Sequence, residues 1–259
     1  MGAVLLGVAI VGGWTAFTAC GVLIGHRVIR KHVAAFHNEV MISLFTAAGV
    51  VYAVLLGFLV VVVWEAYDNA HRNLADEAAT LVPLYRLTYG MQAAQGTELR
   101  TLIRNYAQAV IHDEWPSLGA SRNGSDKARH AIGGIDRVFA KIDTATKNAD
   151  QEVGSEFLRT KSKIVADRNQ RLLEATDTIP WVMWLGAVGG GMIVTAMSFF
   201  IYMERQWPHL LMASFMGMLI GLLLFIMTVL SRPFTGALAL GPEHFQFALQ
   251  VLDDVDRGN

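Results

Sequence analysis

Charged residues and cysteine are both scarce in this sequence. Only 17% of its 259 residues are charged, whereas an ordinary soluble domain has about 25%. The single cysteine, Cys20, excludes an internal disulfide and the paired-cysteine spacings of a zinc site. Acidic and basic residues nearly balance, giving a net charge of −1, so the overall charge favours no nucleic-acid partner.

Motifs that usually carry catalysis or hold a cofactor are missing as well. The sequence has no HExxH motif, no phosphate-binding loop ending in Gly-Lys-Ser/Thr and no GxSxG nucleophile turn. Its eight histidines are scattered and have no carboxylate partner at ligand spacing, so they are interpreted as interface or surface residues. We therefore expect no enzyme activity, no cofactor and no metal site.

Long uncharged stretches are what the sequence has in their place. Asp, Glu, Lys and Arg are absent from residues 3–25, 40–64, 181–203 and 209–231. Each stretch makes about 35 Å of helix at about 1.5 Å per residue. A bilayer core is about 30 Å thick. The sequence therefore predicts four membrane-spanning helices.

Residues inside and at the ends of these stretches agree with a membrane location. Trp64 ends the second stretch and Trp181 begins the third, where amphipathic rings prefer the headgroup level. Gly217 and Gly221 form a GxxxG motif in the fourth stretch, which lets two helices approach closely. The motif is common by chance, so we interpret it as helix packing and not as a dimer face.

Residues 65–180 have the periodicity of helices and no convincing strand alternation. Gly90 and Gly96 are predicted to end a helix that continues from the second span, and Pro83 to kink it. Thr97 is predicted to cap the next helix. Residues 232–259 are interpreted as a C-terminal tail. The predicted fold class is thus an all-α integral membrane protein, with a helical soluble domain inserted between the second and third spans.

The orientation in the membrane is left open by the charges. With four spans, the N-terminus, the middle domain and the C-terminus lie on one side. Lys and Arg occur in the two short loops, but they also occur near both membrane ends of the middle domain. The positive-inside rule therefore does not choose between the two orientations.

A charged stripe follows the second span. Glu65, Asp68, Arg72 and Asp76 are spaced by three, four and four residues, which places them along one helix face. In an oligomer around an axis, this stripe would form rings of charge that select ions. The alternative is a salt-bridge ladder on a solvated face. Glu65 is the stronger functional candidate because it lies at the membrane boundary.

Three polar side chains lie inside the second span: Ser43, Thr46 and Tyr52. Such hydroxyls commonly bond the backbone of their own or a neighbouring helix, and a pore-lining role is the alternative. With Glu65 and Asp68, they are the candidate residues of a pore or its mouth.

Several short strings resemble the signature of a bacterial membrane family of uncharacterised function, described as bestrophin-like. The second span contributes residues 50–58 and the string Val62-Val63-Trp64-Glu65. The matching structural positions are Trp64, Glu77, Tyr85, Arg86, Tyr106, Glu114, Trp115, Pro116, Pro180, Arg232, Pro233, Phe234 and Gly236. The match covers nearly the whole chain. Ser231 departs from it, because the family pattern has Asp before Arg-Pro-Phe.

This resemblance implies a remote similarity to bestrophins, which are pentameric anion channels with four spans and a helical domain between the second and third. It implies a homo-oligomer in the lipid bilayer, a permeating ion, a pore lined by the second span, and a place in the bacterial inner membrane. The aromatic pore neck of bestrophins has no counterpart, because Phe45 and Phe58 are too far apart to form one. Glu65 near the mouth favours cations.

Three functions therefore stay open from the sequence. The first is an oligomeric ion channel lined by the second span. The second is a non-conducting scaffold or sensor whose helical domain binds a partner. The third is a small secondary transporter, which the glycine-rich third span favours but the lack of a clear internal repeat does not.

Overall fold

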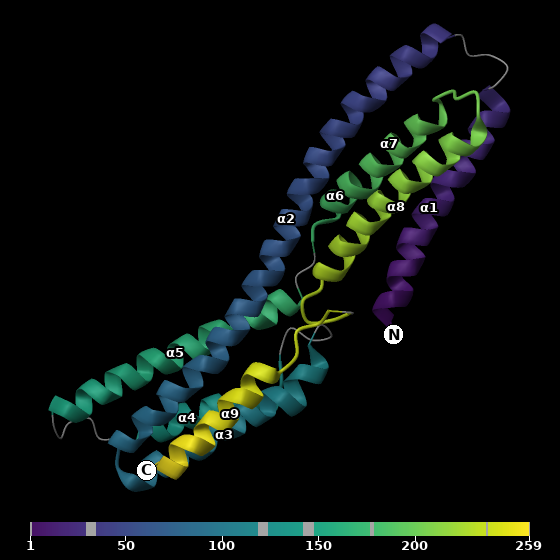
Figure 1. The fold of residues 1–259 in the computed structure, drawn as a ribbon. Helices are drawn as coiled ribbons and strands as arrows, with labels where there is room; N and C mark the ends of the chain where they lie inside the picture. The colour runs from purple at the N-terminus through teal and green to yellow at the C-terminus, as the bar shows by residue number, and fades with distance from the viewer. Residues whose placement is uncertain are drawn as a thin grey trace. The chain divides into compact units, whose positions relative to one another are not determined.

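The computed structural model describes residues 2–29, 35–118, 124–141, 148–176, 179–236 and 238–258, and every regular element in these ranges is a helix (Figure 1). The chain divides into two compact units. Unit 1 comprises Met1–Tyr67, Thr178–Arg232 and Gly236–Leu238. Unit 2 comprises Asp68–Asp177, Pro233–Thr235 and Ala239–Asn259. The helix α2 continues from one unit into the other.

Unit 1 contains the helices that are long and apolar enough to cross a membrane. They are α1 (Gly2–Ile29), α2 (Ala35–Leu87), the run made of α6 (Trp181–Trp184), the π-helical turn η4 (Leu185–Gly189) and α7 (Gly190–Phe199), and α8 (Gln206–Leu230). The predicted all-α class with four such helices is confirmed. The third run is shorter than predicted, since its helix ends at Phe199 and residues 201–203 have no regular secondary structure.

Glycines set the closest helix contacts of unit 1. Figure 1 shows α1 and α8 side by side, and the GxxxG motif of α8 faces α1. A Cβ atom on Gly221 would lie 2.9 Å from the Cα of Val11, and one on Gly217 would overlap the side chain of Thr18. The motif therefore packs two helices of one chain, in agreement with its interpretation as helix packing.

The third run packs against α2 through Tyr52. Cβ atoms on Gly190 and Gly191 would come within 2.7 Å of the Tyr52 side chain, so the two glycines make room for it. The Tyr52 hydroxyl donates a hydrogen bond of 2.9 Å to the carbonyl of Ala187, inside the π-helical turn. Such a turn leaves carbonyls without their usual intrahelical partner, and Tyr52 supplies one.

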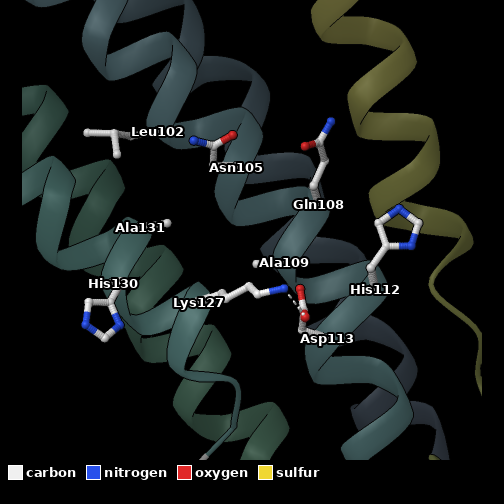
Figure 2. Close-up of a pocket in the computed structure, with 9 residues that line it drawn as sticks. All are labelled: Leu102, Asn105, Gln108, Ala109, His112, Asp113, Lys127, His130 and Ala131. Carbon is white, nitrogen blue, oxygen red and sulfur yellow. Dashed lines mark hydrogen bonds and ion pairs between the residues drawn. The ribbon is translucent and has the colours of Figure 1, made fainter.

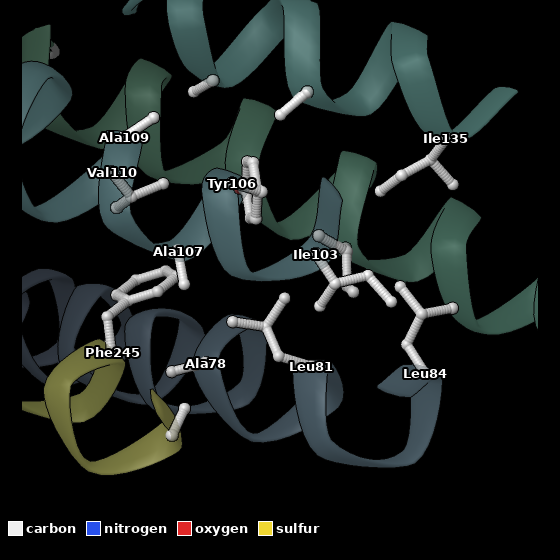
Figure 3. Close-up of a cluster of buried hydrophobic side chains, with 14 of the residues drawn as sticks. Ala78, Leu81, Leu84, Ile103, Tyr106, Ala107, Ala109, Val110, Ile135 and Phe245 are labelled. Carbon is white, nitrogen blue, oxygen red and sulfur yellow. The ribbon is translucent and has the colours of Figure 1, made fainter. Parts of the chain in front are cut away.

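The described part of unit 2 contains the remainder of α2 and further helices and helical turns around an apolar core. They are η1 (Thr88–Gly90), α3 (Ala93–Ala109) with its continuation η2 (Val110–Glu114) and η3 (Trp115–Ser117), α4 (Asp126–Phe139), α5 (Asn148–Thr176) and α9 (Glu243–Gly258). Figure 3 shows the core, where Leu81 of α2, Ile103 of α3, Ile135 of α4 and Phe245 of α9 meet. All four are at most 3% exposed, so the core joins segments that are distant in sequence.

Two of the predicted helix boundaries are wrong. Gly90 does close the turn after α2, but Gly96 lies inside α3 and its N–H bonds the carbonyl of Gln92. A Cβ on Gly96 would lie 2.5 Å from the carbonyl oxygen of Thr88, so this glycine permits a close approach and does not end a helix. Thr97 also lies inside α3, where its hydroxyl bonds the carbonyl of Ala93. Helix α2 continues through Pro83 to Leu87.

Residues 232–259 form more than a tail. They contain α9, whose Phe245, Ala248 and Leu252 are buried in the core of unit 2. The spacing of three and four residues gives the helix one apolar stripe, and burying it holds α9 in place.

Candidate functional site

Helix α2 has one packed face and one open face within unit 1. Tyr52, Leu56, Leu59 and Val63 are buried, and they are spaced by four, three and four residues. At about 100° per residue, the opposite face passes through residues 43, 50, 54, 61 and 65. Every one of these five side chains is exposed. The open face therefore has a serine at one end, valines in the middle and a glutamate at the other end.

Ser43 and Thr46 both bond the backbone of α2. Their hydroxyls donate to the carbonyls of Glu39 at 3.0 Å and of Ile42 at 2.9 Å. Ser43 belongs to the open face, and Thr46 lies at its border. Tyr52 lies on the packed face and bonds Ala187, so it is separated from the other candidate residues of the pore.

The charged stripe beyond the second span contains one intrahelical ion pair. Arg72 pairs with Asp68 one turn earlier, as the salt-bridge alternative predicts. Within the described part of the chain, the carboxylate of Glu65 has no ion-pair partner. Glu65 is thus the first charge at the end of the open face.

A buried ion network lies at the centre of unit 2. The guanidinium of Arg171, in α5, is fully buried. Its Nε lies 2.7 Å from Oε2 of Glu77 in α2, and its Nη2 lies 2.7 Å from Oε1 of Glu114 at the end of η2. Glu114 also accepts a hydrogen bond of 2.6 Å from Arg168 and one of 2.8 Å from the backbone N–H of Ser125. Two carboxylates are therefore balanced by two guanidinium groups away from water.

These contacts shift the pKa values of the network. Burial acts to raise the pKa of Glu114, but Arg171 and Arg168 outweigh it and hold that pKa below its usual value. Burial acts to lower the pKa of Arg171, yet the charge and hydrogen bonds of Glu77 raise it. Burial, followed by the charge of Glu77, raises the pKa of Tyr106, whose hydroxyl donates to Glu77. Glu114 and Arg171 therefore stay ionised, and the Tyr106 phenol stays neutral.

Aromatic rings enclose the network. The guanidinium carbon of Arg171 lies 5.6 Å from the ring centre of Trp115 and 5.7 Å from that of Phe245. Trp115 contacts Phe234 at 6.0 Å between ring centres, and its indole N–H donates to the carbonyl of Leu240 at 3.3 Å. The segment that follows α8 therefore contacts Trp115, which also lies beside Arg171.

Most of the buried signature positions converge on this centre. Glu77, Tyr106, Glu114 and Phe234 belong to it, together with the partly buried Trp115. Tyr85 lies nearby on α2 and donates to Asp256 of α9 at 2.8 Å, while Arg104 donates to both side chains. The exposed signature positions are Trp64, Arg86, Pro116, Pro180, Arg232 and Gly236. Pro233 is partly buried. Gly236 has φ +120°, a conformation that favours glycine.

Sequence reasoning missed Arg168 and Arg171 as members of the network. Their spacing was the available signal. The two arginines continue the buried face of α5 that begins with Phe157, Thr160 and Ile164, at further steps of four and three residues. Arginine on the apolar stripe of a helix needs a buried acidic partner. The sequence alone does not say which acidic residue that partner is.

A polar groove lies between α3 and α4 of unit 2. It encloses about 580 Å³, and Figure 2 shows Asn105, Gln108 and His112 on one wall and Lys127 and His130 on the other. Lys127 pairs with Asp113 at 2.6 Å across it. All five of the named wall residues are exposed, so the groove has no buried polar group that would select a ligand.

Comparison with known proteins places this fold in a family. The model of the bestrophin-like domain matches residues 12–245. Two crystal structures of a bacterial bestrophin homologue from Klebsiella pneumoniae are similar to the chain, each with a TM-score of 0.73. One is 12% identical and covers 93% of this chain and 98% of its own. The other is 10% identical and covers 94% and 98%.

A crystal structure described as a membrane protein is similar to the same extent, with a TM-score of 0.73, 11% identity and coverage of 94% of this chain and 97% of its own. No curated protein matches the sequence. The family model covers most of the chain, and the four apolar helices agree with an integral membrane protein. The chain belongs to the bestrophin-like family.

Proposed function

We propose that this protein is a homo-oligomeric ion channel of the bestrophin type, with α2 lining the pore. The observation that carries the proposal is the open face of α2, in a fold shared with bacterial bestrophin homologues over 93% of the chain. Unit 2 is the helical domain outside the membrane in this proposal, inserted between the second and third spans. The bacterial inner membrane is the proposed location.

The open face suits a pore because its two ends are polar and its middle is apolar. Val50, Val54 and Val61 are between 51% and 60% exposed in the single chain. Copies of α2 around an axis would surround a path narrowed by these valines, with Ser43 at one end and Glu65 at the other. Apolar constrictions of this kind gate by dewetting, and carboxylate rings concentrate cations. Asp68 extends the mouth by one turn, and Tyr52 is left to helix packing.

A non-conducting scaffold or sensor is the second candidate. The polar groove between α3 and α4 favours it, because a groove of about 580 Å³ is large enough for a small polar molecule. Its exposed walls contain no buried anchor, so we rank this function below the channel.

Replacing Glu65 by Gln tests the channel. The purified protein is placed in liposomes, and cation and anion flux are measured separately from matched gradients. We expect cation flux from the unaltered protein and a fall in the cation-to-anion ratio of roughly tenfold in Glu65→Gln at low salt. The fall should shrink at high salt, where charges are screened.

Glu98→Gln is the matched control, since Glu98 is an exposed carboxylate on α3. It should leave the ratio unchanged. An unchanged cation-to-anion flux ratio in Glu65→Gln would show that Glu65 does not lie at the mouth of the pore. No flux of either sign, from protein that is folded and oligomeric, would reject the channel and favour the scaffold.

A further inference from the structure

Two histidines that are far apart in the sequence lie together on unit 2. His71 belongs to α2, and His244 lies in the first turn of α9. Their Nε2 atoms are 3.3 Å apart, with 5.2 Å between ring centres and 62° between ring planes. His71 is exposed and His244 is partly buried, so solvent reaches the pair.

The spacing of the two nitrogens matches that of two ligands of one metal ion. Zinc binds imidazole nitrogen at about 2.0–2.1 Å in tetrahedral geometry, and this places two ligand nitrogens about 3.3–3.4 Å apart. The observed Nε2–Nε2 distance of 3.3 Å agrees with this spacing. Imidazole suits zinc, copper and nickel, whereas calcium and magnesium prefer oxygen ligands.

Both histidines are carried by a rigid frame. Ala70 and Leu74, on either side of His71 along α2, are fully buried, and so is Phe245, which follows His244. Ligands held by packed helices lose little freedom on binding, and this raises the affinity of a small site.

We propose that His71 and His244 bind a divalent transition-metal ion, represented by Zn²⁺, through their Nε2 atoms, and that the ion links α2 to α9. Within the described residues, no group of three or more His, Cys, Asp or Glu side chains could hold a metal, so water completes the coordination. The site is open and reversible for this reason. It departs from the sequence-based expectation of no metal site, because 173 positions separate its two ligands.

Zinc titration of the full-length protein tests the proposal. Untagged protein in detergent competes with a chromophoric zinc indicator, and Co²⁺ absorption reports the geometry. We expect one ion per chain and a tetrahedral Co²⁺ spectrum. Each of His71→Ala and His244→Ala should weaken binding by roughly 100-fold, because one remaining ligand loses the advantage of the second.

His112→Ala and His130→Ala are the matched controls, since both histidines are exposed elsewhere on unit 2. Both control variants should bind Zn²⁺ with the same affinity as the unaltered protein. Thermal unfolding without metal checks that all four variants are folded, and added Zn²⁺ should raise the midpoint only where both ligands are present. Absence of binding by the unaltered protein, or binding by the His71 and His244 variants as tight as that of the unaltered protein, would overturn the proposal. No ion flux enters the measurement, so its outcome is independent of the channel.

Discussion

Arg171→Met is expected to lower the free energy of unfolding of unit 2 by about 3–5 kcal/mol, because it leaves buried carboxylates without their partner. Arg171 is fully buried and bonds both Glu77 and Glu114. The thermal midpoint, followed by circular dichroism of the purified protein, should fall on the order of 10 °C.

Two further variants test whether the loss of stability is specific to the buried network or follows from removing any arginine of α5. Arg159→Met changes the same residue type on the same helix, where Arg159 is exposed and pairs with Glu156, and it should leave the midpoint unchanged. The double variant Arg171→Met with Glu77→Gln removes one of the stranded charges, so it should lose less than the sum of the two single variants. Equal losses in Arg159→Met and Arg171→Met would contradict the network as a stabilising centre.

Phe245→Ala is expected to cost about 3–5 kcal/mol of stability, since it opens a cavity in a closely packed core. Phe245 is fully buried and lies 6.3 Å from Trp115 between ring centres. Phe247 is two residues away on the same helix and 66% exposed. Phe247→Ala therefore removes the same side chain without a core cavity.

Thermal unfolding of both variants measures the difference. We expect a large fall in the thermal midpoint for Phe245→Ala and little change for Phe247→Ala. Trp115 fluorescence should change only in the first, because its indole contacts the lost ring. A larger fall in the midpoint for Phe247→Ala than for Phe245→Ala would mean that α9 packs against unit 2 by the face that carries Phe247.

The membrane helices were predictable because their signal is local. An uncharged stretch of more than twenty residues has few alternatives to a membrane span. The sequence does not tell which side of such a helix packs against the other helices, because apolar residues occur all around it. The pore role suggested for Tyr52 shows this, since its burial and its contact with Ala187 place it on the packed face.

The network and the histidine pair depend on contacts that no local pattern specifies. Arg171 meets Glu77 across 94 positions and Glu114 across 57. The family signature pointed to Glu77 and Glu114 but not to the arginines that neutralise them. Gly96 was misread for a related reason, because its close contact with Thr88 belongs to the turn that precedes α3.

The most direct test of the central claim, that the open face of α2 lines an ion path, is a comparison of two neighbouring cysteine substitutions. Val61 lies on the open face and Val62 lies about 100° around the helix. Their side chains are 51% and 46% exposed in the single chain, so they are well matched. Each is replaced by Cys in a Cys20→Ser background, which removes the native exposed thiol.

Ion flux from liposomes is then measured before and after reaction with a charged thiol reagent, with labelling confirmed by mass. The account predicts that modification abolishes most of the flux in Val61→Cys and leaves Val62→Cys unchanged. Flux that is lost at residue 62 but kept at residue 61, or kept at both after complete labelling, would contradict it.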